Sequence, residues 1–201
     1  MQTKNPLENL KGVDLSHLSK AEAKEFTLLL EELEKREKRE SSMASFYDFV
    51  KTIWPEFIAG AHHKKMAEAF DKIANGESKR LIINMPPRHT KSEFASYLFP
   101  AYLLGKRPKL KIIEATHTAD LAINFGRRVR DLIESDDYAE IFPATQLKAD
   151  SRSAGKWTTS QGGEYYAAGI GGALAGRGAD LFIIDDPHSE QDAFSDKALE
   201  E

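Results

Sequence analysis

The stretch Arg80-Leu-Ile-Ile-Asn-Met85-Pro-Pro-Arg-His-Thr-Lys91-Ser92 carries three local signals in succession. Residues 80–85 form a short apolar run bounded by polar residues, which predicts a buried β-strand. The two prolines that follow indicate a tight turn. Residues 90–99 then have the character of a helix, which we expect to be broken or kinked at Pro100. The stretch therefore predicts a strand, a turn and a helix without intervening chain.

A unit of this kind can bind phosphate groups. Backbone N–H groups of the turn and of the helix N-terminus face the phosphate oxygens, a lysine reaches the β and γ oxygens, and a hydroxyl ligates Mg²⁺. Lys91 and Ser92 stand where that lysine and that hydroxyl are needed. The usual pattern is Gly-x-x-x-x-Gly-Lys-Ser/Thr, and here Met85 and Thr90 occupy its two glycine positions. An ordinary strand-to-helix turn is therefore an alternative interpretation.

A second signal lies downstream, in Leu181-Phe-Ile-Ile-Asp185-Asp186. The four apolar residues predict another buried strand, and the two carboxylates follow at its carboxyl end, where ligands bind in open α/β sheets. In phosphate-transfer enzymes the first such acid holds the Mg²⁺ shell and a following acid polarises the attacking water. Two adjacent carboxylates also require a nearby cation. A polar strand terminus without a catalytic role is the alternative.

Further helices and strands alternate along the chain. Apolar periodicity predicts helices at residues 46–54, 62–74 and 119–134, a strand at 111–116, and a hairpin at 157–166 around Gln161-Gly-Gly163. Strands that alternate with helices indicate an α/β fold with a mostly parallel sheet and helices on both faces.

The first 45 residues differ in character from the rest. Ser19-Lys-Ala-Glu22 has the spacing of a capping box, and nine of the ten residues 31–40 are charged, with both signs mixed. This predicts a solvated helix that ends near Ser41-Ser42, either resting on the body or serving as a docking arm for a partner subunit. We divide the chain into a helical arm, residues 1–45, and a globular domain, residues 46–201.

Composition excludes several classes of protein. The chain has 201 residues, 41% of them hydrophobic, which is enough for a buried core. It has no cysteine, so disulfides, thiolate zinc sites and cysteine nucleophiles are excluded. The longest uncharged apolar stretch, residues 94–104, is too short to span a bilayer. The net charge of −4 argues against a chain that coats nucleic acid through bulk charge.

Five segments, in this order, resemble the large terminase subunits of tailed bacteriophages over about residues 46–193. They are Pro86-Pro-Arg-His-Thr-Lys-Ser-Glu93, Phe99-Pro-Ala-Tyr-Leu-Leu-Gly105, Phe125-Gly-Arg-Arg-Val-Arg130, Gly171-Gly-Ala-Leu-Ala-Gly-Arg-Gly-Ala-Asp180 and Ile183-Ile-Asp-Asp-Pro187. The resemblance implies a P-loop NTPase of the ASCE type that hydrolyses ATP with Mg²⁺ and drives double-stranded DNA into a procapsid. It also implies a homo-oligomeric ring, a portal protein and a small terminase subunit as partners, no membrane, and action in the host cytoplasm.

The same resemblance assigns roles to the phosphate-binding stretch. Lys91 and Ser92 correspond to the Walker A lysine and hydroxyl, and Asp185 corresponds to the Walker B acid that holds Mg²⁺ together with Ser92. Arg88 stands at a basic position of the family's deviant Walker A, where it contacts the γ-phosphate or reaches across a subunit interface. The nucleotide-binding segment as a whole comprises Pro87, Arg88, His89, Thr90, Lys91, Ser92 and Glu93.

Other roles stay open at this stage. Asp186 and Glu190 are both candidates for the catalytic carboxylate. Arg177, in a glycine-rich loop, is a second candidate for an arginine that stabilises transition-state charge, and a mobile surface loop is the alternative. Phe57 and one of the two histidines His62 and His63 are candidates for contact with adenine. Core packing and helix capping are the alternative for both.

The family continues past the Walker B strand with a coupling strand and a nuclease, for which this chain offers no segment. The resemblance therefore predicts a fragment of the motor with an incomplete sheet, whose exposed edge is protected by a partner or by self-association. One alternative function is an inactive assembly piece recognised through residues 20–40. Another is a metal-dependent nuclease, built on Asp180, Asp185, Asp186 and Asp192. The basic clusters at residues 106–111 and 127–130 suit solvation, intersubunit contact or DNA phosphates.

Overall fold

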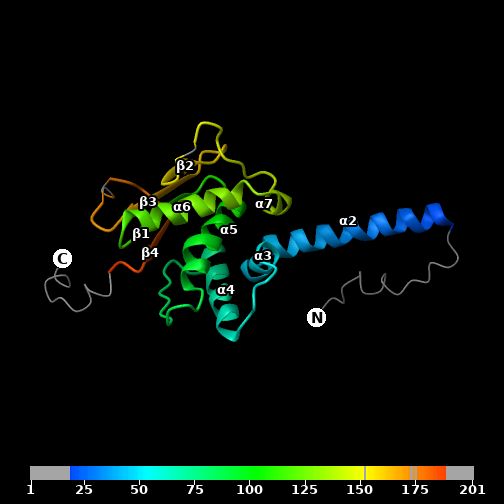
Figure 1. Ribbon diagram of the computed structural model, residues 1–201, viewed down its shortest axis with the longest axis horizontal. Coiled ribbons are helices and arrows are strands. Elements are labelled where there is room, and N and C mark those ends of the chain that lie inside the picture. Colours follow the sequence, from blue (N-terminus) through cyan, green and yellow to red (C-terminus); the bar gives the residue numbers. More distant parts are fainter. Residues whose placement is uncertain (1–18, 152, 173, 175, 189–201) are drawn as a thin grey trace.

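The computed structural model describes residues 19–151, 153–172, 174 and 176–188. This part of the chain is an α/β structure in which helices flank a four-stranded mixed sheet, and one long helix projects from the body (Figure 1). Glu190, Asp192 and the first part of the predicted arm lie outside the described residues. None of the described helices combines the length and the apolar character that crossing a membrane requires.

The sheet has the strand order β2-β3-β1-β4. Strands β1 (Lys111–Thr116), β3 (Glu164–Gly169) and β4 (Leu181–Asp185) are parallel, and the short β2 (Lys156–Thr158) pairs antiparallel with β3. The predicted strands at 111–116 and 181–184, the hairpin and the mostly parallel sheet are confirmed. Thr116 is in register with both Gly169 and Asp185, so the carboxyl ends of the three parallel strands meet at one edge of the sheet.

The helices with substantial contacts to the sheet cover one of its faces, whereas the sequence predicted helices on both. Helix α6 (Ala119–Ile133) lies against Tyr165, because Gly126 is close enough that a Cβ there would meet the tyrosine ring at 3.0 Å. The indole N–H of Trp157 donates to the Gly126 carbonyl at 2.9 Å and fixes the same approach. On the opposite face of the sheet, Phe182 and Ile184 of the edge strand β4 are exposed, and the described part of the chain supplies no helix that covers them.

Residues 80–85 are not part of the sheet, so the strand predicted there is wrong. The segment has no ladder partner among the described residues, and a cavity of about 960 Å³ separates it from β4. An apolar run becomes a strand only where a neighbouring chain supplies the hydrogen bonds of a ladder. Here no such neighbour is present in the described residues, and the segment runs past the edge of the sheet unpaired.

The helix predicted after the turn at residues 86–90 passes through Pro100 without a break. A π-helical segment, η1 (Glu93–Leu98), leads directly into α5 (Phe99–Lys106), which has Pro100 in its first turn. Proline has no N–H for the usual bond to the carbonyl four residues earlier. The helical turn that precedes the proline is wider than an α-helical turn, since the N–H of Phe99 bonds to the carbonyl of Phe94, five residues back.

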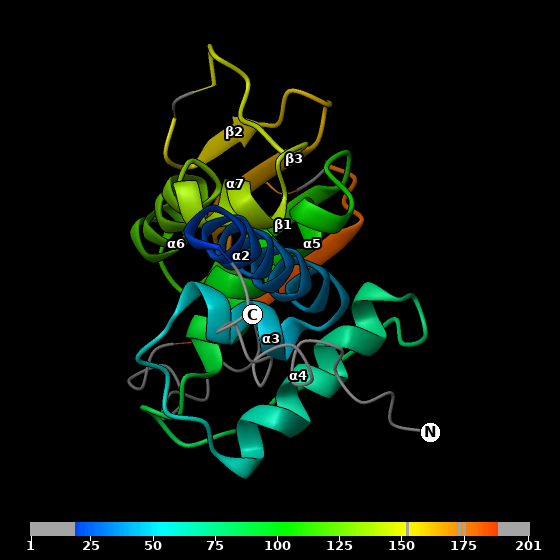
Figure 2. The same ribbon diagram turned by 90° about the vertical axis from the view of Figure 1, so that its right-hand side faces the viewer.

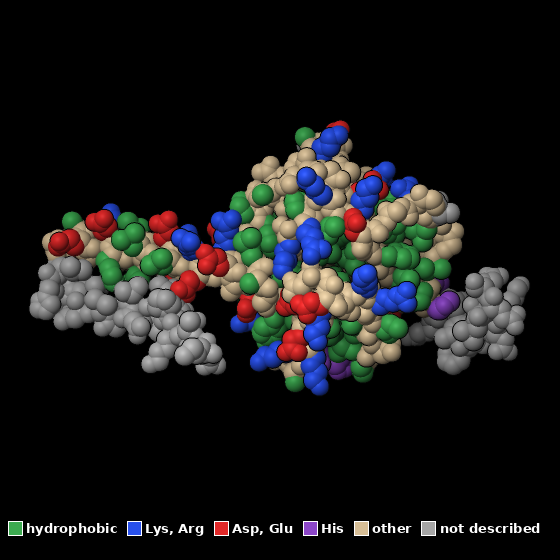
Figure 3. All heavy atoms as spheres, turned by 180° about the vertical axis from the view of Figure 1, so that it is seen from behind, with side chains coloured by type: hydrophobic (Ala, Val, Ile, Leu, Met, Phe, Trp, Pro, Cys, Tyr) green, Lys and Arg blue, Asp and Glu red, His purple; other side chains and the backbone are tan. Residues whose placement is uncertain are grey.

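The projecting helix is α2 (Lys20–Ala44), and the predicted capping box at its start is confirmed: the Ser19 hydroxyl accepts from the N–H of Glu22, and the glutamate accepts from the N–H of Ser19. It runs a few residues past the predicted end. Figure 3 shows charged and hydrophobic side chains along it. Its last turn is held to the body by a 2.9 Å hydrogen bond between the hydroxyls of Ser42 and Thr52. Figure 2 looks nearly along α2, with the strands on one side and α3 and α4 on the other.

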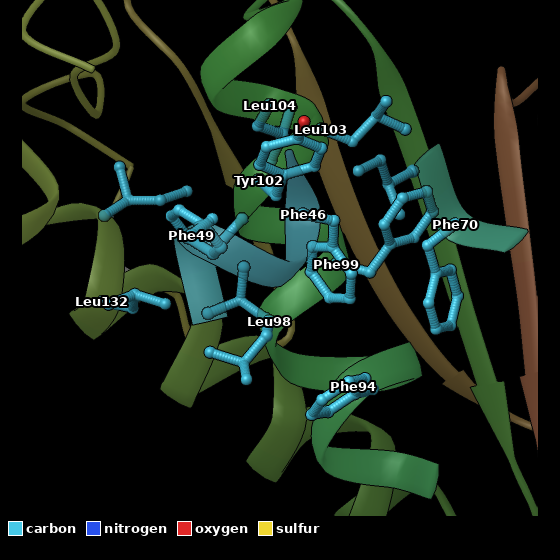
Figure 4. Packing of buried hydrophobic residues seen from close by; sticks show 14 of the residues in the cluster. Phe46, Phe49, Phe70, Phe94, Leu98, Phe99, Tyr102, Leu103, Leu104 and Leu132 are labelled. Carbon is cyan, nitrogen blue, oxygen red and sulfur yellow. The ribbon is translucent and has the colours of Figure 1, made fainter. Parts of the chain in front are cut away.

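The main core is aromatic and lies between the short helices and α5. Helices α3 (Phe46–Ile53), α4 (Ala61–Ala74) and α7 (Asp136–Ile141) enclose it, and the first two match the predicted helices at 46–54 and 62–74. Phe46 is fully buried, and its ring lies within 5.5 Å, centroid to centroid, of four aromatic rings (Figure 4). These are Phe70, Phe94, Phe99 and Tyr102. The core therefore fixes the helix that carries Lys91 relative to α3 and α4.

Candidate phosphate- and metal-binding site

Lys91 and the two acids after β4 lie together. The Lys91 ammonium is 3.4 Å from Oδ1 of Asp185 and donates a hydrogen bond to Oδ1 of Asp186. Ninety-five residues separate Lys91 from Asp186 in the sequence. The expectation that the two adjacent carboxylates need a cation is met by this lysine. The site sits at the edge of the sheet where the parallel strands end.

The charges around Lys91 explain its protonation. Partial burial favours the neutral amine, but the hydrogen bond with Asp186 and the negative charges of both aspartates outweigh it and raise the pKa of Lys91. Asp185 is only 5% exposed, whereas the Asp186 side chain is largely in solvent. One buried and one accessible carboxylate thus share one ammonium. An anion that approached Lys91 would compete with both of them.

Two buried residues that the sequence did not single out, Ser96 and Glu114, belong to the surroundings of Asp185. The Ser96 hydroxyl of η1 donates to Oδ2 of Asp185 at 3.1 Å, and Ser96 is fully buried. Glu114, in the middle of β1, is also fully buried, and neither of its carboxyl oxygens has a hydrogen-bond partner among the described residues. Burial, reinforced by the charge of Asp185, raises the pKa of Glu114 well above its usual value. A glutamate inside an apolar strand was the sequence signal for it.

The turn before Lys91 has an unusual backbone. Arg88 and Thr90 have φ angles of +63° and +61°, in the left-handed region that glycine usually occupies. Thr90 is the residue at the second glycine position of the usual pattern, and its left-handed φ shows why glycine is common there. Such residues persist only where surrounding contacts hold them.

His63 of α4 supplies one of those contacts. Its Nδ1 accepts from the N–H of Gly60 at 2.8 Å, so the proton of the neutral ring is on Nε2. Nε2 is 2.8 Å from the Thr90 hydroxyl, which in turn donates to the His89 carbonyl at 2.6 Å. The turn is therefore tethered to α4 through a neutral histidine.

We expect this tether to make stability depend on pH. Burial first, and then the charges of His62 and His89, lower the pKa of His63, so the ring stays neutral in the folded chain where an unfolded histidine would protonate. The stabilisation that the neutral His63 ring gives to the fold is complete above about pH 6.5 and is lost as the pH falls below that value. The free energy of unfolding, from urea titrations at pH 7.5 and 5.5, should fall less steeply in His63→Gln than in wild type.

The exposed histidine His188 provides the control for that experiment. His188→Gln should leave the wild-type slope in place, because its side chain lies in solvent. If the free energy of unfolding of His63→Gln fell between pH 7.5 and 5.5 as steeply as that of wild type, His63 would not be the source of the pH dependence.

The two residues considered for contact with a nucleobase lie in different surroundings. The Phe57 ring packs at 4.7 Å from His63 and 5.5 Å from Phe94, so its contacts are those of core packing. The His62 ring lies tilted against His63, with 3.8 Å between ring centroids, and is 5.7 Å from the ring of His89 in the turn. The structure thus places His62 beside the turn that precedes Lys91, whereas Phe57 packs against His63 and Phe94; both side chains are partly buried.

The remaining residues of that stretch take different places. Ser92 follows Lys91 in the first helical turn and is partly exposed. Glu93 forms a two-pronged ion pair with Arg128 of α6, with N–O distances of 2.9 and 2.6 Å, which ties the two helices together. Pro87 and His89 are exposed in the turn, where the Pro87 carbonyl contacts the His89 ring at 2.9 Å.

Arg177 lies away from this site. Its guanidinium stacks 3.8 Å from the centre of the Tyr166 ring and lies 3.7 Å from a carboxyl oxygen of Glu164. Glu164 is in register with Lys111, at the amino ends of the parallel strands. The opposite edge, where Asp185 and Lys91 lie, is five residues away along β1, about 16 Å. The described conformation therefore does not bring Arg177 to Lys91, because Tyr166 and Glu164 hold it elsewhere.

Comparison with protein-family models gave no match to the chain, and comparison with curated proteins also gave none.

Proposed function

We propose that this chain binds Mg·ATP at the edge formed by Lys91, Asp185 and Asp186, and that it is the ATPase part of a DNA-packaging motor. The observation that carries the proposal is the convergence of a lysine at the start of a helix with two acids at the end of a parallel strand. This is the arrangement that phosphoryl-transfer enzymes need: a cation for the β and γ oxygens and carboxylates for the metal.

The residues present suit magnesium. Mg²⁺ is held by one or two carboxylates together with phosphate oxygens and water, and all of the donors here are hard oxygens. Asp185 and the Ser92 hydroxyl would hold it, and it would neutralise charge on the phosphates. Phosphate binding at Lys91 frees the carboxylates from their present ion pairs. Asp186, which is accessible, is then placed to orient the attacking water.

The proposal that the chain is part of a DNA-packaging motor is based on the terminase resemblance. Double-stranded DNA, the portal, a small terminase subunit, a ring of copies and action in the host cytoplasm belong to the proposal in that form. Arg88 is exposed in the phosphate-binding turn, which suits a role toward phosphate or toward a neighbouring subunit. The alternative of a two-metal nuclease gains no support, since Asp180 binds the N–H of Lys111 at the opposite end of the strands.

Substitution of Lys91 tests the proposal. In Lys91→Ala, affinity for a fluorescent ATP analogue in the presence of Mg²⁺ should fall at least tenfold, because the cation for the phosphates is lost. Lys148→Ala is the matched control, since Lys148 also pairs with an aspartate, at 3.2 Å, but far along the chain from the site. Phosphate release measured in parallel separates binding from turnover. Equal affinity in wild type and Lys91→Ala would refute the proposal.

A further inference from the structure

Helix α2 carries an apolar stripe along its first turns. Apolar residues recur there at spacings of three and four residues, which places them on one face of the helix: Ala23, Phe26, Leu30 and Leu33. Phe26 and Leu30 are partly exposed, and Leu33 is 41% exposed. Leu29, at the border of the stripe, is 52% exposed. These turns project away from the described body, which leaves the stripe without a surface of the body to pack on (Figure 1).

A projecting helix of this kind gains stability from a partner surface. Helix formation alone contributes little in water, and most helical stability in proteins comes from the packing of an apolar face. Ser42, in the last turn, is the only residue of α2 that is buried. A surface that covered the stripe would therefore stabilise the whole first part of the helix.

The charges beside the stripe are complementary to themselves. Lys20 and Glu34 lie along one border of the stripe, Glu22 and Arg36 lie along the other, and all four are exposed. When two such helices pack antiparallel, each border meets the same border of the other helix. Lys20 then faces Glu34 of the other copy, and Glu22 faces Arg36. The exposed ion pair of Arg36 with Glu40 of its own helix uses the Nε–H and leaves other guanidinium donors.

The same register also stacks the apolar residues. Phe26 faces Leu30 of the other copy, and Leu29 lies beside its own counterpart. A shift by one heptad sets Phe26 against Glu37 in one direction and Leu30 against Ser19 in the other. A parallel pair sets Glu37 against itself and brings no opposite charges together at the borders. One antiparallel register therefore satisfies both the apolar stripe and the charges.

We propose that α2 is an interaction surface for a second copy of this chain. Two α2 helices pair antiparallel over residues 20–36, about a two-fold axis at residue 28. Residues 37–44 set this overlap off from α3 by about 12 Å of helix. The overlap is short for an interface, so the dimer dissociates on dilution. The contact does not depend on whether the chain hydrolyses ATP.

Exchange of two charges tests the register. In sedimentation equilibrium of the full chain between about 1 and 100 µM, wild type should pass from monomer to dimer. Glu34→Lys sets like charges against Lys20 at both ends and should raise the dimer Kd at least tenfold. The double variant Lys20→Glu/Glu34→Lys restores opposite charges and should return the Kd to within about threefold of wild type. Glu32→Lys is the control, because it makes the same charge change on the outer face of the helix.

Two leucines test the apolar stripe. Leu30→Lys buries two ammonium groups against Phe26 and should leave the chain monomeric up to about 100 µM. Leu28→Lys is the matched control and should dimerise like wild type, because Leu28 is 56% exposed on the side of the helix away from the stripe. Melting curves establish that the body of each variant is folded.

Nitroxide labels test the orientation. The chain has no cysteine, so Leu28→Cys and Lys38→Cys each provide a single labelling site. In the antiparallel dimer the two labels at position 28 lie at the same height, and those at position 38 lie about 30 Å apart along the axis. Double electron–electron resonance measures both distances. Four results would overturn the proposal: a monomer at about 100 µM, equal losses in the control variants, no recovery in the double variant, or equal label distances.

Discussion

Replacing Phe46 by alanine should lower the free energy of unfolding by about 3–5 kcal/mol, the range for a large aromatic side chain removed from a packed core. Phe46 is fully buried and contacts rings from α4, η1 and α5. Its backbone N–H also donates to Asp71 of α4 at 2.9 Å. The lost contacts and the cavity left behind both weaken the packing of α3. Urea denaturation followed by far-UV circular dichroism measures the change.

Phe182→Ala is the control for this variant, since that ring is half exposed on β4 and its truncation leaves no enclosed cavity. We expect a change below about 1 kcal/mol there. The consequence for the site is indirect but large, because the Phe46 cluster positions the helix that begins at Lys91. A loss in Phe46→Ala no greater than that in Phe182→Ala would mean that this cluster does not carry the fold.

Glu114→Gln should stabilise the protein at alkaline pH. Burial raises the pKa of Glu114, so the folded chain holds this proton where the unfolded chain, with an ordinary value near 4.5, has lost it. Its contribution to stability is therefore complete below about pH 4.5 and is lost as the pH rises above that value. At pH 8 we expect the free energy of unfolding of Glu114→Gln to exceed that of wild type by about 1 kcal/mol or more, because each unit by which folding raises a carboxyl pKa costs about 1.4 kcal/mol above that pKa.

The gain should be smaller at pH 5 than at pH 8, since at pH 5 the unfolded wild-type carboxyl is partly protonated as well. Glu140→Gln, at an exposed position of α7, is the control and should change stability by less than about 0.5 kcal/mol at either pH. A gain of the same size at pH 5 and pH 8 would show that titration of Glu114 is not its source. The affinity of Glu114→Gln for the fluorescent ATP analogue, measured alongside, tells whether the buried carboxyl also affects binding at Asp185.

Local features of the fold could be predicted because their hydrogen bonds close within a few residues. The capping box of Ser19 and Glu22 and the hairpin around Gly162 are of this kind. Strand β1 matches its predicted bounds although its ladder partners, β3 and β4, lie far along the chain. Helix α7 escaped prediction, because six residues are too few to show a helical period.

The residues of the candidate site could be found from the sequence, but their pairing could not. Lys91, Ser92, Asp185 and Asp186 could be singled out from short motifs, and the need for a cation beside two carboxylates follows from electrostatics alone. Which cation it is could not be read from the chain, because the pairing spans ninety-five residues. The place of Arg177 could not be read from the chain either, because Tyr166 and Glu164, which contact it, become its neighbours only when the sheet forms.

By itself, the sequence determined the strand-forming and helix-forming segments, the charged helix before the globular part and the residues suited to phosphate and magnesium. Tertiary structure decided which of these segments pair. Residues 80–85 have the composition of a strand and its alternation, yet they lie outside the sheet. The physical reason is that a strand is completed by hydrogen bonds to a neighbour, and the position between this segment and β4 is a cavity.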